Sequence, residues 1–133
     1  MFELLMVASL LLTQGAPKSV ALPDTPQGKH IKNYVDAFNS GDEKKFMAWF
    51  EANVSPAILA KRSPEERAKM FQRMKGDFGK LVVTKVLKST AQQIQVVFPT
   101  ADGQAEGTFT FDFEADAPYK VSGISVEVQS GLP

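Results

Sequence analysis

The chain contains no cysteine and one histidine, His30. Without cysteine there can be no disulfide framework, thiolate nucleophile, cysteine-ligated zinc or iron–sulfur cluster. A single histidine excludes a two-histidine metal site within one chain. The sequence also has no glycine-rich phosphate loop, no G-x-S-x-G motif and no metal-ligand spacing. We therefore expect no metal, no cofactor and no catalytic residue.

Neither sign of charge is in excess. Of 133 residues, 15 are Lys or Arg and 15 are Asp or Glu, so the net charge is zero. Nucleic-acid binding normally requires a clustered basic excess to neutralise phosphates, so no nucleic-acid partner is expected. The basic residues between positions 61 and 75 alternate with Glu65 and Glu66, which is typical of a solvated helix face.

Near the amino terminus the apolar residues form only a short run. Leu4–Leu12 spans nine residues, one of them polar. A membrane-spanning helix needs about 20, whereas nine suit the apolar region of a signal peptide. Ser19 and Ala21 supply small residues at the −3 and −1 positions of a cleavage site.

We therefore expect a signal peptide over residues 1–21, cleaved after Ala21, and export to the periplasm or the exterior of a bacterium. The alternative is an apolar first helix packed on the domain, because Met1–Glu3 has no basic side chain. Residues 22–28, with two prolines and a glycine, are predicted to be a linker. A chain of this length then holds one domain, over residues 29–130.

Periodicity predicts helices in the first half of the domain. Apolar residues recur at helical spacing from about Gly28 to Ser40, and again after Asp42, which can cap a second helix. Ser55 and Pro56 are expected to start a single turn that runs through residues 57–59. Ser63 and Glu66 form a capping box for the third helix, which Gly76 is expected to end.

The second half of the domain alternates as strands do. Strands are expected over residues 81–89, 92–98, 107–114 and 119–129, with a bulge at Ser122 and Gly123 where the alternation slips by one residue. Helices segregated from strands indicate an α+β fold. The expected architecture is three N-terminal helices packed on one face of a curved four-stranded antiparallel sheet.

Aromatic residues are abundant, with ten phenylalanines, two tyrosines and one tryptophan. In an α+β cone they could line an apolar pocket between the helices and the sheet. The alternative is a plain core, because the same residues fall at core spacings. Tyr34 and Trp49 would each offer a ligand a polar group. The predicted ligand-binding residues are Tyr34, Phe38, Trp49, Phe71, Met74, Phe109 and Phe111.

Other chemical groups are expected at the surface. His30 stands in the first turn of a helix after the linker and is interpreted as an exposed histidine. Asp112 and Glu114 lie on the strand face opposite Phe111 and Phe113, which is the solvated face. Asp36 lies on the polar side of the first helix.

Three segments carry a resemblance to a known group of domains. Residues 31–42 (IKNYVDAFNSGD), the pair Arg67-Ala68 and residues 77–81 (DFGKL) resemble a small domain found beside bacterial exported serine hydrolases of the β-lactamase-related class and beside tail-specific-type peptidases. That domain is similar to NTF2-like domains. The resemblance, with the order of elements, implies an NTF2-like (cystatin-like) cone and an accessory or binding role, with an exported hydrolase or another envelope protein as partner.

Three functions follow as hypotheses. The first is an exported, non-enzymatic module that binds a partner protein or a small apolar ligand. The second is an isomerase or dehydratase, which would need a buried carboxylate beside Tyr34. The third is a homodimerising domain that pairs through the polar outer face of its sheet. The residues named for that face are Gln93, Gln95, Val97, Thr108, Thr110 and Asp112.

Overall fold

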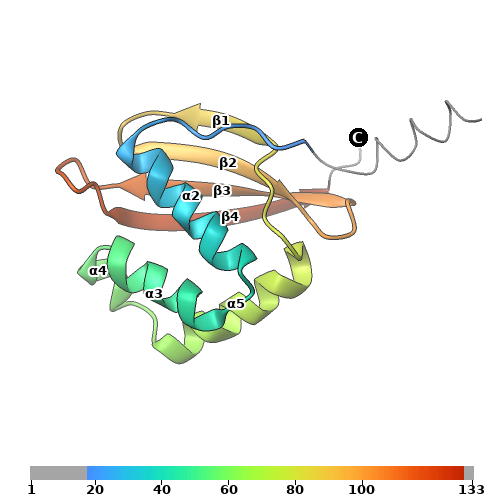
Figure 1. The fold of residues 1–133 in the computed structure, drawn as a ribbon, viewed down its shortest axis with the longest axis horizontal. Helices are drawn as coiled ribbons and strands as arrows, with labels where there is room; N and C mark the ends of the chain where they lie inside the picture. The colour runs from blue at the N-terminus through green and yellow to red at the C-terminus, as the bar shows by residue number, and fades with distance from the viewer. Residues whose placement is uncertain (1–17, 131–133) are drawn as a thin grey trace, which may run out of the picture.

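The computed structural model describes residues 18–130, so most of the expected signal peptide lies outside the described residues. Four helices precede four strands in the described chain (Figure 1). The helices are α2 (Pro26–Asn39), α3 (Glu43–Asn53), α4 (Pro56–Leu59) and α5 (Pro64–Phe78). The strands are β1 (Lys85–Ser89), β2 (Gln93–Pro99), β3 (Ala105–Phe113) and β4 (Val121–Ser130).

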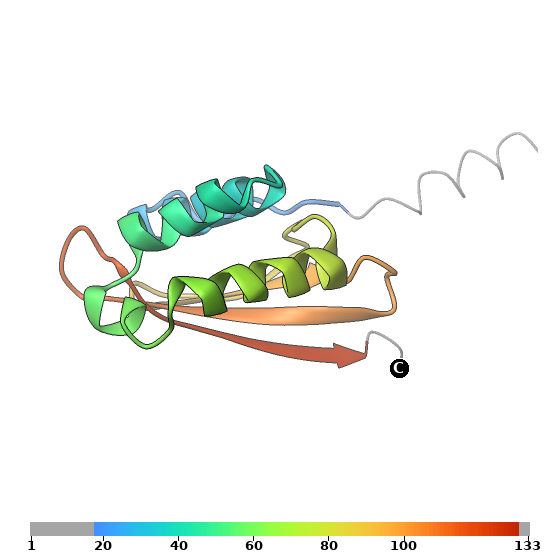
Figure 2. The same ribbon diagram turned by 90° about the horizontal axis from the view of Figure 1, so that it is seen from below.

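The strands form one antiparallel sheet in the order β1-β2-β3-β4, and the helices lie on one side of it (Figure 2). This arrangement confirms the α+β class and the four antiparallel strands. The sheet is open and is not strongly curled. The expected count of three helices was wrong for residues 18–130, because the single turn near residue 57 forms the separate helix α4.

Side-chain caps fix the start of three helices. Thr25 accepts a hydrogen bond from the Gly28 amide, and Asp42 accepts one from the Lys44 amide, as expected for that aspartate. The capping box of Ser63 and Glu66 is complete. The backbone amide of Ser63 donates to the Glu66 carboxylate, which lowers the pKa of Glu66.

Two helix ends differ from the sequence prediction. α2 begins at Pro26, inside the expected linker. Within this helix, Gly28 lies so close to the Pro23 carbonyl that a Cβ atom on residue 28 would collide with it. α5 passes through Gly76 and ends at Phe78, and its C-cap is Gly79, whose φ of 67° suits a residue without a side chain. The two additional residues of the helix bring Phe78 into a buried position against the sheet. This packing outweighs the helix-weakening effect of Gly76.

The predicted bulge is present in β4. Asp112 pairs with Gly123, and the next residue, Phe113, pairs with Val121, so Ser122 has no partner in the register. The bulge keeps Val121 and Ile124 on the face that the helices cover. β3 alternates buried and half-buried residues from Gly107 to Phe113, which places its phenylalanines beneath the helices.

Candidate functional site

The seven predicted ligand-binding residues all lie in one buried cluster between the helices and the sheet. Their exposed fractions range from 0% to 8%. They come from α2, α3, α5 and β3, which shows that the sequence pattern identified residues that share one place in the fold. These residues are Tyr34, Phe38, Trp49, Phe71, Met74, Phe109 and Phe111.

The rings of this cluster pack directly on one another. The Tyr34 ring centroid lies 4.9 Å from that of Trp49 and 5.3 Å from that of Phe111, both edge to face. Phe38 meets Phe71 at 5.5 Å in the same manner. Such edge-to-face contacts are the favoured geometry of aromatic pairs and fill the space between the helices and the sheet.

The two polar groups expected to orient a ligand have partners within the protein. The Tyr34 hydroxyl donates to the Met74 sulfur at 3.7 Å, and the Trp49 indole donates to the His30 carbonyl at 3.0 Å. Burial raises the pKa of Tyr34 well above its usual value. The ligand-binding role of the seven residues stays a prediction, and the structure gives them a packing role.

The carboxylates considered for acid–base chemistry lie elsewhere. Asp36 is exposed and pairs with Lys32 at 2.8 Å on the surface of α2. Asp112 accepts a hydrogen bond from Gln93 at 2.8 Å on the sheet face away from the helices. The structure therefore does not bring either carboxylate to the Tyr34 hydroxyl, which was the condition for an isomerase or dehydratase.

His30 has a different environment from the one expected. The interpretation of His30 as a simple exposed histidine was wrong, because the ring is half-buried and both nitrogens have partners. Its Nδ1 lies 2.7 Å from the Asn53 Oδ1, and its Nε2 lies 2.9 Å from the Pro118 carbonyl oxygen. The ring also stacks on Phe113 at 6.2 Å. His30 thus joins α2, α3 and the β3–β4 loop.

Gln27 makes a second connection from the same end of α2. It is buried, and its Nε2 donates to the Ala91 carbonyl in the β1–β2 turn at 2.9 Å. Gln27 and His30 are three residues apart, so both side chains leave the same side of the helix. The start of α2 therefore holds two loops in place. Gln27 binds the β1–β2 turn, and His30 binds the β3–β4 loop.

Between these two loops lies an open hollow of about 400 Å³. We name it the loop-end hollow; its lining residues are Gln27, Thr90, Ala91, Gln92, Ala115 and Tyr119. Tyr119 is half-buried and adopts a φ of 58°, which is uncommon for a residue with a side chain. Its amide donates to the Asp116 carbonyl at 2.8 Å in a turn that contains the cis Ala117–Pro118 bond. Residues other than glycine with a positive φ, like Tyr119, gather at functional sites.

Sequence reasoning missed the loop-end hollow because its residues come from three separate segments. Gln27 fell in the expected linker, and Tyr119 was placed at the start of a strand. One signal was available: Pro118 and Tyr119 follow Asp116 in a turn-forming stretch, and an aromatic residue in a loop is a frequent binding residue.

Arg67 is the other polar residue whose position differs from the prediction. It was expected on a solvated helix face, yet its exposed fraction is 4%. Its Nη1 donates to the carbonyls of Leu59 and Arg62 at 3.1 and 2.7 Å, and the guanidinium lies 5.9 Å from the Phe50 ring centroid. Arg67 therefore ties the segment after α4 to α5.

No protein-family model, curated protein or solved structure matches this chain. Within residues 18–130, no group of three or more His, Asp or Glu side chains is arranged to hold a metal ion. None of the helices in the described part of the chain has both the length and the apolar character needed to cross a membrane.

Proposed function

We propose that this chain is an exported, non-enzymatic module of the NTF2-like (cystatin-like) type that binds a partner protein of the cell envelope at the loop-end hollow. One observation carries the proposal. Gln27 and His30 hold two loops around an open hollow, while the interior between the helices and the sheet is filled with rings.

The filled interior favours a partner protein over a small apolar ligand. An apolar ligand would have to separate rings whose centroids lie about 5 Å apart and displace the Tyr34–Met74 contact. Dense packing of this kind makes a cavity costly to open. The loop-end hollow is already open, so a partner can enter it without rearranging the core.

The lining of the hollow suits a polypeptide segment. Gln92 is exposed and offers an amide group, and Tyr119 offers a ring with one polar end, whereas the Gln27 amide and the Thr90 hydroxyl bond within the protein and shape the wall. Tyrosine is enriched among the residues that contribute most to protein interfaces, because it combines apolar area with a hydrogen-bonding group. A loop held by His30 also loses less conformational entropy when a partner binds.

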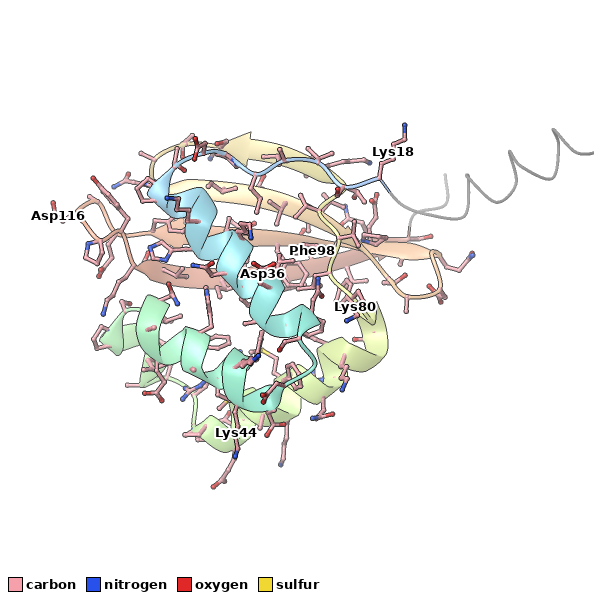
Figure 3. All side chains as sticks on the ribbon, viewed as in Figure 1. Lys18, Asp36, Lys44, Lys80, Phe98 and Asp116 are labelled. Atoms are coloured by element: carbon pink, nitrogen blue, oxygen red, sulfur yellow. The ribbon has the colours of Figure 1, made fainter. Side chains whose placement is uncertain are left out.

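Site-specific photocrosslinking tests the proposal. Tyr119 is replaced by the photoreactive residue p-benzoylphenylalanine in the exported chain, and crosslinks are formed in intact bacteria. A matched variant carries the same residue at Lys44, an exposed position in α3 that lies well away from Asp116 and the β3–β4 loop (Figure 3).

The expected result is a protein adduct of defined mass from position 119 and none of that mass from position 44. A further change of Gln92 to Ala in the same background should weaken the adduct. The absence of any adduct from position 119, or equal adducts from both positions, would contradict binding at the loop-end hollow.

A further inference from the structure

The two edges of the sheet are built differently. β1 and β4 are the outer strands of the order β1-β2-β3-β4. β1 has five residues, two of them lysines, and its register is interrupted by a bulge between Val86 and Lys88. Short length, lysine and bulges are the features that keep an edge strand from pairing with another chain.

β4 is not short, and beyond its first residues it has neither a lysine nor a bulge. It is ten residues long, and Glu127 is its one charged side chain. Its start is covered, because the Ser55 amide donates to the Val121 carbonyl and Val54 forms a bridge with Val121. The bulge at Ser122 also lies at this end. From Ser125 onward every described residue of β4 is exposed.

The exposed part of β4 presents apolar side chains on the helix-covered face of the sheet. Val126 pairs with Phe109 and Val128 with Gly107, so these valines point to the same side as the core. They nevertheless have exposed fractions of 44% and 60%. Figure 2 shows one reason: β4 diverges from α5 toward its C-terminal end. A hollow of about 470 Å³ opens beside Val128 and Phe78.

We propose that β4 pairs antiparallel with β4 of a second copy of this chain, which joins the two sheets into one of eight strands. The sequence of β4 fits itself in one register, with Val126 opposite Val126 of the other copy. Ile124 then faces Val128, and the three apolar positions of each copy form a continuous strip. Directly opposed apolar side chains are the unit that stabilises paired strands.

Charge selects this register over its neighbours. With Val126 at the two-fold axis, Glu127 of each copy faces Ser125 of the other. Moving the axis to Glu127 would bring two carboxylates directly opposite each other, which is destabilising. Moving it to Ser125 would set Val128 against Ser122. An interface of one strand pair is small, so the dimer is expected to be weak and concentration-dependent.

Oxidative crosslinking of single-cysteine variants tests the register, because the natural chain has no cysteine. Directly opposed residues on paired strands are close enough for a disulfide. Val126→Cys should therefore give a disulfide-linked dimer in most of the protein. Leu87→Cys, a somewhat more exposed position on β1, is the control and should stay at least tenfold less crosslinked. An equimolar mixture of Ile124→Cys and Val128→Cys should crosslink more than either variant alone.

Sedimentation velocity of the full chain over a range of concentrations tests the association itself. The natural chain should shift from monomer to dimer, Val126→Lys should remain monomeric, and Leu87→Lys should behave as the natural chain. A chain that stays monomeric up to millimolar concentration would overturn the proposal. So would a dimer that survives Val126→Lys, or crosslinking that is equal at positions 87 and 126. These results do not depend on the Tyr119 experiment, because the exposed part of β4 is not in the lining of the loop-end hollow.

Discussion

The Nε2 atom of His30 lies 2.9 Å from the carbonyl oxygen of Pro118, although 88 residues separate the two in the sequence. The contact joins the start of α2 to the β3–β4 loop and places Tyr119 at the rim of the loop-end hollow. The arrangement makes the loop part of the folded framework.

Replacing His30 with Ala should loosen this loop. The variant loses the polar contacts of the ring with the Asn53 Oδ1 and the Pro118 carbonyl oxygen, and the stacking on Phe113, with an expected cost of about 1–3 kcal/mol in the free energy of unfolding. The Tyr119 amide, which donates to Asp116, should exchange its hydrogen faster. Hydrogen exchange measures this directly, and the exposed neighbour Lys29→Ala is the control. Unchanged exchange at Tyr119 would refute the role of His30.

Arg67→Ala should destabilise the protein although arginine is usually a surface residue. The substitution leaves the carbonyls of Leu59 and Arg62 without their donor, at a cost of about 1.5–3 kcal/mol. Arg73→Ala, on the exposed side of the same helix, should change stability by less than about 0.5 kcal/mol. Urea unfolding of both variants measures the difference in the free energy of unfolding. Equal effects would contradict a stabilising role for the buried Arg67 guanidinium.

Two glycines should respond to alanine in opposite directions. At Gly107 a Cβ atom would lie 2.8 Å from the Phe78 ring, so Gly107→Ala should cost about 1–3 kcal/mol. At Gly76 a Cβ atom would meet no heavy atom within 4 Å apart from the neighbouring backbone of its own helix, and helix propensity should make Gly76→Ala more stable by about 0.5–1 kcal/mol. Thermal unfolding of both variants tests the packing of α5 on β3. A destabilised Gly76→Ala variant would show that α5 is packed differently.

Tyr34→Phe should change the alkaline limit of stability. Because burial raises the pKa of Tyr34, the folded state keeps the phenol neutral above pH 10, whereas the unfolded state ionises it near its usual value of about 10. Stability of the natural chain should therefore fall with rising pH from about 10 upward, by up to about 1.4 kcal/mol per pH unit from this group. Tyr34→Phe should lack this contribution.

At pH 8 the two proteins should have nearly equal stability, because the variant loses only a long hydrogen bond to sulfur. Denaturant unfolding at pH 8 and at pH 10.5 measures both points. If the free energy of unfolding changed equally in the variant and in the natural chain between these two pH values, the burial of the Tyr34 hydroxyl would be contradicted.

Local signals in the sequence were sufficient for most of the fold. The capping box of Ser63 and Glu66, the cap at Asp42 and the slip of alternation at Ser122 each depend on a few neighbouring residues, and the structure contains all three. The end of α5 was misplaced because the packing of Phe78 on the sheet, a long-range contact, overrides the local preference of Gly76.

The site was harder to predict for the same reason. The aromatic cluster could be found from periodicity, but periodicity does not distinguish a pocket from a filled core. The partners of His30 and Gln27 are Pro118 and Ala91, which lie far along the chain. Only the tertiary structure brings these loops to the start of α2.

Native mass spectrometry of the chain, purified gently from a bacterial envelope, tests the central claim most directly. If binding occurs at the surface and the interior is filled, the spectrum should show the chain, its dimer or a complex with a second protein, with no small adduct. An adduct of a few hundred daltons that disappears on denaturation would contradict the account. It would show that the chain holds a small ligand, which the proposal of a protein partner does not include.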